Sequence, residues 1–244
     1  MSSDFKSLRL AIACPMANEK ATASAFVREL LDVCAPLGDV RFVAVFDNTC
    51  VDGSMDILKG MARDDSRISV VFAPECTCPV DAYLRSYREA LATGFEWVLE
   101  INAGYRHQPS DLPQYFPCML QGYDCIFGSR FLPGGQMAAP SFRRQLFSKG
   151  GTYVANALLG TKLADMTSGY QMFKREMLER LLARGIQSRY HFFQTEMKAY
   201  CRKGRSIEVP IRYKTGAKGL KMKVLADAVY HLGRLVLLRA TARL

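Results

Sequence analysis

Apolar runs alternate with amphipathic stretches along the first half of the chain. The runs are short enough for buried strands, and the stretches between them place apolar residues at helical spacing. The predicted strands cover residues 8–14, 40–47, 68–73, 95–101 and 123–129. The predicted helices cover residues 19–38, 52–63, 81–94 and 109–121, the last broken by Pro117. This alternation predicts a mostly parallel sheet that helices cover on both faces.

Helical segments dominate the second half of the chain. Helices are predicted over residues 141–160 and 192–204, and a loop that leads into a helix is predicted over residues 165–185. Residues 205–213 are predicted to form a strand, followed by a basic, glycine-containing loop, "TGAKGLKMK". No repeat, low-complexity tract or Ser/Gly linker divides the sequence. We therefore expect one domain at 1–222, followed by a basic amphipathic helix at 223–244.

Turn residues and polar groups follow four of the predicted strands. The segments are "PMANE" (15–19), "DNTCVDGS" (47–54), "NAGYRH" (102–107) and "GSRFLPGG" (128–135). Ligands of open parallel sheets bind beyond the carboxyl ends of the strands. The four segments are therefore expected to build one shared site.

The net charge of +10 is concentrated near the C-terminus. Residues 202–244 hold eleven Lys and Arg against Glu208 and Asp227 alone, which makes +9. A basic segment of this kind suits nucleic acid, an anionic membrane surface or a phosphorylated ligand. It has neither interleaved aromatic residues nor a recognisable nucleic-acid module, so we expect no nucleic-acid partner.

Cysteine and histidine usage bears on the compartment and on metals. The eight cysteines are scattered, without a CxxC pair or a Cys/His cluster, and the three histidines show no metal-ligand spacing. The N-terminal residues show neither a signal-peptide core nor a cleavage pattern. We expect reduced thiols and a cytoplasmic protein.

Taken in order, these segments resemble glycosyltransferase family 2, and within it the dolichol/polyprenol-phosphate mannose synthase group. "IACPMANE" is similar to the family's opening Pro-x-x-Asn-Glu loop, and "FDNTCVDGS" to its Asp-Asp-Gly-Ser-x-Asp-Gly turn. The later motifs are matched by "FGSRFLPGG", "SFRRQLFS", "LADMTSGYQMFKREML" and "FFQTEM". The resemblance implies an α/β, nucleotide-sugar-binding GT-A (Rossmann-like) single domain with a mostly parallel central sheet.

The implied reaction is an inverting transfer of a hexose, such as mannose. The donor would be a GDP- or UDP-linked sugar, and the acceptor polyprenyl phosphate or another phosphorylated molecule. A phosphate monoester has a second pKa of about 6, so its oxygen is already anionic at neutral pH and needs little general-base help. The protein must instead hold two phosphate groups of like charge, which requires cations and oriented N–H donors.

The resemblance implies a nucleotide-sugar pocket on three of the loops. Its residues are Pro15, Asn18, Glu19, Asp47, Asn102, Ala103 and Gly104. Asn18 also suits a helix N-cap and Glu19 a first-turn acid, and both roles can hold at once.

Further motifs imply groups that bind the acceptor phosphate. These are Arg130, Arg144, Ser148, Lys218 and Lys221, with Arg130 and Arg144 also placed in the catalytic set beside Asp165 and Arg106. Residues 144 and 148 share a helix face, which lets one patch bind one phosphate. The alternatives are that Arg144 solvates an exposed helix and that Asp165 only orients a loop. In "FFQTEM", Gln194 and Glu196 lie on different helix faces, so only one of them can face a shared site. The other interpretation is a buried acid that pairs with an arginine.

The metal-binding motif of the family is altered here. The family's Asp-Ala-Asp, followed two positions later by a polar residue, holds Mg²⁺ or Mn²⁺; here these positions are Asn102, Gly104 and Arg106. Hard divalent cations prefer anionic oxygens, so we expect no metal cofactor and expect Arg106 to supply the positive charge instead. In a second departure, "PVDAY" replaces the family's Gly-Leu-Gly around residues 79–83.

Two functional hypotheses stay open at this point. One is a metal-independent glycosyltransferase that uses Arg106; the other is a catalytically silent nucleotide-binding homologue with a regulatory or scaffold role, in which Arg106 is a surface loop residue. In residues 223–244, charges interrupt every apolar run before the ~20 residues that span a bilayer. This segment suits peripheral association with an anionic membrane, a helix packed on the domain or a contact between copies of the chain.

Overall fold

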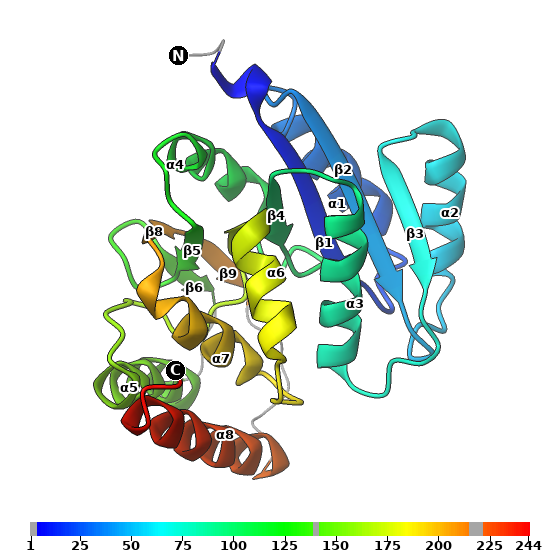
Figure 1. The fold of residues 1–244 in the computed structure, drawn as a ribbon. Helices are drawn as coiled ribbons and strands as arrows, with labels where there is room; N and C mark the ends of the chain where they lie inside the picture. Colours follow the sequence, from blue (N-terminus) through cyan, green and yellow to red (C-terminus); the bar gives the residue numbers. More distant parts are fainter. Residues whose placement is uncertain (1–3, 139–141, 215–221) are drawn as a thin grey trace.

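The computed structural model describes residues 4–138, 142–214 and 222–244, without the side chains of residues 142–144. Within these residues, one mostly parallel sheet of seven strands has the order β3-β2-β1-β4-β7-β5-β8 (Figure 1). Its strands are β1 (Arg9–Pro15), β2 (Asp39–Phe46), β3 (Ile68–Phe72), β4 (Trp97–Glu100), β5 (Cys125–Ser129), β7 (Gln171–Lys174) and β8 (Ser206–Pro210). A second sheet pairs β6 (Gln136–Ala138) with β9 (Arg212–Lys214). The predicted fold class is confirmed.

Helices cover both faces of the main sheet (Figure 1). The α-helices are α1 (Ala23–Val33), α2 (Ser54–Asp64), α3 (Pro79–Ala92), α4 (Phe116–Met119), α5 (Phe142–Leu159), α6 (Arg175–Arg184), α7 (Phe193–Tyr200) and α8 (Met222–Ala240). Short 3-10 helices are η1 (Asp4–Ser7), η2 (Pro109–Gln114) and η3 (Cys201–Lys203). The central strand β1 is buried on both faces of the sheet. Leu10 and Ile12 pack in the core with α1, and Ala11 and Ala13 pack in the core with α3.

Strand β7 departs from the sequence prediction, which had a loop over the first part of residues 165–185. Its four residues pair antiparallel with β4 on one side and with β5 on the other. The segment is too short for its own periodicity to be informative, and its pairing partners are distant in the sequence. The predicted strand 205–213 is also divided, into β8 and β9 around Ile211.

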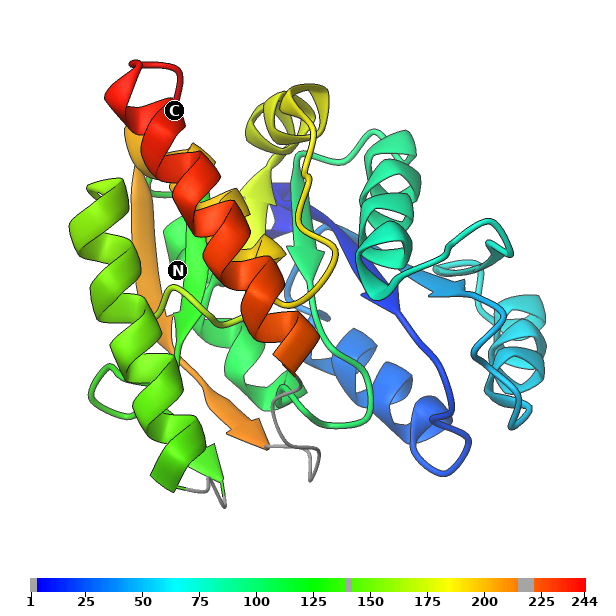
Figure 2. The ribbon, with the colours of Figure 1, turned by 90° about the horizontal axis from the view of Figure 1, so that it is seen from below.

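The C-terminal segment forms α8, which lies beside α5 (Figure 2). Its inner face contributes His231 and Leu235 to the interior, and Leu244 joins the same apolar cluster with Leu159 of α5. Arg239 of α8 donates hydrogen bonds to the carbonyls of Ala157 and Leu158 at the end of α5. No helix in the described part of the chain is long and apolar enough to cross a membrane.

Candidate functional site

The first two loops at the carboxyl ends of the strands are joined by hydrogen bonds. The Asn18 amide donates to the carbonyl of Thr49 at 2.7 Å and accepts from the Val51 N–H at 3.0 Å. The Glu19 N–H donates to the hydroxyl of Ser54 at 2.7 Å. Asn18 adopts φ 58°, in the left-handed region that asparagine tolerates better than most residues. The structure thus brings the predicted residues of loops 15–19 and 47–54 together.

The third loop, residues 102–107, approaches the first loop, residues 15–19, at Gly104. A Cβ atom built on Gly104 lies 2.2 Å from Oε2 of Glu19, and Gly104 has φ +67°. A side chain at this position meets both a steric conflict and backbone strain. The next residue, Tyr105, also has a positive φ, 57°. Glycine is therefore favoured at position 104 by its positive φ, and any side chain there would displace the carboxylate of Glu19.

Asn102 is held from two sides. Its Oδ1 accepts a hydrogen bond from the hydroxyl of Tyr83 at 2.6 Å, and its N–H donates to Nδ1 of His107 at 3.1 Å. Burial, reinforced by nearby Arg130, lowers the pKa of His107 to about 3, so the imidazole is neutral and accepts this bond. Tyr83 belongs to the "PVDAY" segment. The two departures from the family pattern are thus in direct contact.

The side chains present do not fit the implied divalent cation. The amide oxygen of Asn102 is neutral and already accepts a hydrogen bond, and Gly104 offers no ligand. Among the described residues, no group of three or more His, Cys, Asp or Glu could hold a metal ion. Magnesium and manganese prefer several anionic oxygens, which this loop does not provide.

Arg106 lies on the same loop and is exposed. Its backbone carbonyl accepts a hydrogen bond from the N–H of Lys214 at 2.8 Å, which fixes the loop beside β9. Within the described residues, its guanidinium is not engaged in any ion pair. An exposed arginine of this kind is available to an anionic ligand.

Arg130 and Asp165, predicted as separate site groups, form one buried ion pair. Nε and Nη2 of Arg130 donate to the two carboxylate oxygens of Asp165 at 2.7 and 2.8 Å, and the Arg130 side chain is only 6% exposed. Burial alone would raise the pKa of Asp165, but the hydrogen bonds and charge of Arg130 hold it below its ordinary value. A carboxylate in this state is a poor proton acceptor. This arrangement fits the alternative that Asp165 orients a loop, and it gives Arg130 a partner within the protein. The catalytic roles of both residues stay predictions.

The loop that carries Asp165 has further supports. Glu208 of β8 accepts the N–H groups of Ala164 and Asp165 at 2.6 and 2.9 Å, and Nζ of Lys198 donates to the carbonyl of Asp165 at 2.6 Å. Such a network makes this loop rigid. Ser148 lies on α5 and is partly exposed. The other predicted acceptor groups, the Arg144 side chain, Lys218 and Lys221, lie outside the described residues.

A buried carboxyl behind the third loop escaped the sequence prediction. Glu100, at the end of β4, accepts hydrogen bonds from the Tyr87 hydroxyl and from the amides of Gln171 and Gln194. Burial raises the pKa of Glu100 to about 7, although these hydrogen bonds oppose the shift. The only sequence signal was a charged residue within the apolar run "FEWVLEI". Tyr83 had no comparable signal, because its contact with Asn102 exists only in the fold.

Gln194 and Glu196 face different surroundings, as their spacing predicted. Gln194 joins the cluster around Glu100, whereas Glu196 is fully buried and accepts from the N–H and hydroxyl of Ser188. Arg234 of α8 forms an ion pair with Glu196. This is the buried acid paired with an arginine that the sequence left as an alternative. It also fixes α8 to the domain.

Comparison with known proteins finds relatives of this chain. A family model, Glycosyl transferase family 2, matches residues 11–182. An undecaprenyl-phosphate mannosyltransferase of Micrococcus luteus is 28% identical over 197 residues, covering 79% of this chain and 81% of the relative. A polyprenol monophosphomannose synthase of Mycolicibacterium smegmatis is 26% identical over 208 residues, covering 84% and 77%.

Solved structures show the same fold. A glucosyl-3-phosphoglycerate synthase from Mycobacterium tuberculosis, in complex with Mn²⁺, UDP and phosphoglyceric acid, superposes with a TM-score of 0.64 at 15% identity. The match covers 98% of this chain and 82% of that one. At this level of identity the likeness concerns the fold alone.

Proposed function

The chain belongs to glycosyltransferase family 2, and from this premise we propose that it transfers a hexose from a nucleotide-sugar donor to polyprenyl phosphate, with inversion and without a metal ion. Both curated relatives carry names that specify polyprenyl-type phosphate and mannose. Mannose is accordingly the first sugar to test. The donor is either GDP- or UDP-linked.

The contact between Gly104 and Glu19 carries the metal-free part of the proposal. The carboxylate of Glu19 lies in the space that the side chain of the family's second aspartate would need at position 104. The hydroxyl of Tyr83 already donates a hydrogen bond to Oδ1 of Asn102. The loop is therefore organised around direct side-chain contacts. Arg106 is the cation on this loop that remains available to a diphosphate.

The donor pocket is proposed to use the joined loops 15–19 and 47–54. Oδ1 of Asp47 accepts both the N–H and the hydroxyl of Thr49. Its other oxygen accepts no hydrogen bond within the described residues, which leaves it for a base or ribose donor. Pro15, Asn18 and Glu19 line the same edge of the sheet.

The reaction then needs little proton transfer. An anionic oxygen of the acceptor phosphate attacks the anomeric carbon, and the bond from that carbon to the diphosphate oxygen breaks on the opposite face. The leaving nucleoside diphosphate gains negative charge, which the guanidinium of Arg106 stabilises. No general base is required, which fits the low pKa of Asp165.

The surface formed by α5 and α8 supports a membrane-bound acceptor. Nine of the twelve exposed large apolar residues in the described chain lie on these two helices: Leu146, Phe147, Tyr153, Val154, Leu158, Met222, Val229, Tyr230 and Leu237. The helices lie side by side (Figure 2). Their sequences hold seven Lys and Arg in residues 142–159 and 222–244, against Asp227 alone. An apolar face with basic residues suits the interface of an anionic membrane, and we propose peripheral, cytoplasmic association there.

The direct test is product formation. Purified protein would be incubated with undecaprenyl phosphate in anionic vesicles and a panel of GDP- and UDP-sugars, with lipid products identified by mass spectrometry. One glycosylated lipid phosphate, with the anomeric configuration inverted relative to the donor, is the expected result. Absence of product with every donor, while a nucleotide still binds, would favour the catalytically silent alternative.

A further inference from the structure

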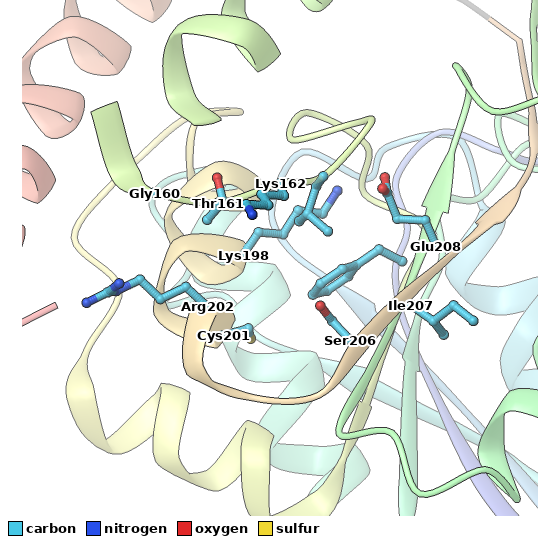
Figure 3. Close-up of a pocket in the computed structure, with 11 residues that line it drawn as sticks. Gly160, Thr161, Lys162, Lys198, Cys201, Arg202, Ser206, Ile207 and Glu208 are labelled. Carbon is cyan, nitrogen blue, oxygen red and sulfur yellow. The ribbon is translucent and has the colours of Figure 1, made fainter. Parts of the chain in front are cut away.

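A cavity of about 570 Å³ lies away from the carboxyl ends of the strands. Its walls come from the residues that follow α5, from α7 and η3, and from β5 and β8 (Figure 3). Strand β8 runs parallel to β5, and the cavity reaches Ser206, at the start of β8. The volume falls in the range of small-molecule sites. The proposed transfer reaction makes no use of it.

Cations dominate the lining. Lys162, Lys198 and Arg202 contribute three positive charges, against one carboxylate, that of Glu208. Figure 3 shows Lys162, Lys198 and Glu208 around the same space, with Arg202 extending away from them at the rim. The local charge therefore favours an anionic ligand.

Lys198 is the unusual member of this set. Lys198 is only 1% exposed, and its ammonium group lies 5.2 Å from the ring centre of Phe127. Within the described residues, one of its three N–H donors has an acceptor, the carbonyl of Asp165. A buried ammonium ordinarily requires more acceptors than this. The Nε atom of Arg202 is likewise buried without an acceptor among the described residues.

We propose that this cavity binds a small phosphorylated, hydroxylated molecule. A phosphate group would accept hydrogen bonds from Lys198 and Lys162, with the Ser206 hydroxyl as a further donor at the opening. Glu208, on the β8 side, would accept a hydroxyl group of the ligand. Charge-assisted bonds to phosphate are the strong interactions in such a site.

A ligand in the cavity would affect the loop that carries Asp165. Lys198 and Glu208 line the cavity and also hold the backbone of Ala164 and Asp165. A ligand that fixes both side chains stabilises these backbone contacts. Hydrogen exchange at the two amides should slow when the cavity is filled.

Titration calorimetry with glycerol 3-phosphate, and with inorganic phosphate, tests the proposal on the full chain. Lys198→Gln and Lys162→Gln should each weaken glycerol 3-phosphate binding about tenfold or more. Lys59→Gln, which removes an exposed lysine from α2, is the matched control and should change nothing. Because Lys198 is buried and its variant risks misfolding, Ser206→Asp serves as the second variant. It places a carboxylate at the exposed opening and should also abolish binding.

The Arg106→Ala variant separates this site from the proposed active site. Glycerol 3-phosphate binding and amide protection at Ala164 and Asp165 should persist in that variant. The proposal is overturned if the unaltered protein binds neither probe at millimolar concentration. It is equally overturned if Arg106→Ala removes the binding while Lys162→Gln and Ser206→Asp do not.

Discussion

Gly104 offers a quantitative test of how the candidate site is built. With φ +67°, any other L-residue at this position pays about 1–2 kcal/mol of backbone strain. A Cβ atom would also lie 2.2 Å from the carboxylate of Glu19, so that side chain must move and give up the hydrogen bond from the Thr22 hydroxyl, 3.1 Å long. Losing that bond costs about 1 kcal/mol more. Gly104→Ala should therefore destabilise the fold by about 2–3 kcal/mol.

A second background separates the two contributions. In a Glu19→Ala protein the steric conflict is absent, so Gly104→Ala should cost only the strain of about 1–2 kcal/mol. Urea unfolding of the four proteins gives the coupling energy, provided that the m-value stays constant. Equal costs in both backgrounds, or no cost in the unaltered background, would refute the contact between Gly104 and Glu19.

The same geometry limits any attempt to restore the family's metal motif. Gly104→Asp adds a negative charge against Glu19 in addition to the steric conflict. Replacing Asn102 and Gly104 by aspartate is therefore expected to destabilise the loop. It should not create Mn²⁺ binding while the guanidinium of Arg106 supplies a positive charge on the same loop.

Four other variants test three separate parts of the structure. Tyr83→Phe removes the hydroxyl that donates a hydrogen bond to Asn102, and it should lower the free energy of unfolding in urea by about 1 kcal/mol. It should also weaken binding of the nucleotide sugar in titration calorimetry. Burial raises the pKa of Glu100 from 4.5 to about 7, so its contribution to stability is present below pH 4.5 and is lost as the pH rises through 7. The free energy of unfolding of Glu100→Gln should therefore rise by up to ~3 kcal/mol relative to that of the unaltered protein across that window. A difference between the two free energies that stays constant with pH would contradict this. On the surface of α5 and α8 that we propose to bind the membrane, Tyr153→Asp and Tyr230→Asp, at residues 76% and 69% exposed, should each reduce flotation with anionic vesicles about tenfold. Phe72→Asp, at an exposed residue on β3, should not reduce it.

The parallel part of the sheet could be predicted because its signal is local. The run of residues 8–14 is buried on both faces, and the helix after it has a clear apolar side, so pattern alone identifies both elements. Strand β7 could not be found in this way, since "QMFK" becomes a strand only between two partners that lie far away in the sequence. Helix 223–244 was predictable, but its anchoring by Arg234 to Glu196 was not.

The candidate site divides along the same line. Motif order brought Asn18, Glu19 and Asn102 to one edge of the sheet, because strand ends are fixed by the fold. Which side chains pair there depends on atomic distances. The ion pair of Arg130 with Asp165 therefore could not be read from their motifs, which lie 35 residues apart in the sequence.

Sugar transfer with and without free metal tests the central claim most directly. The rate would be measured with the productive donor and undecaprenyl phosphate, in excess EDTA and in Mn²⁺, for the unaltered protein, Arg106→Ala and Arg106→Lys. Arg88→Ala, at an exposed arginine of α3, is the control. We predict equal rates in EDTA and Mn²⁺, a loss of about ten- to a hundred-fold in Arg106→Ala, and partial recovery in Arg106→Lys, because a point charge cannot reproduce a bidentate contact. A rate that EDTA abolishes and Mn²⁺ restores, with Arg106→Ala unchanged, would contradict the account.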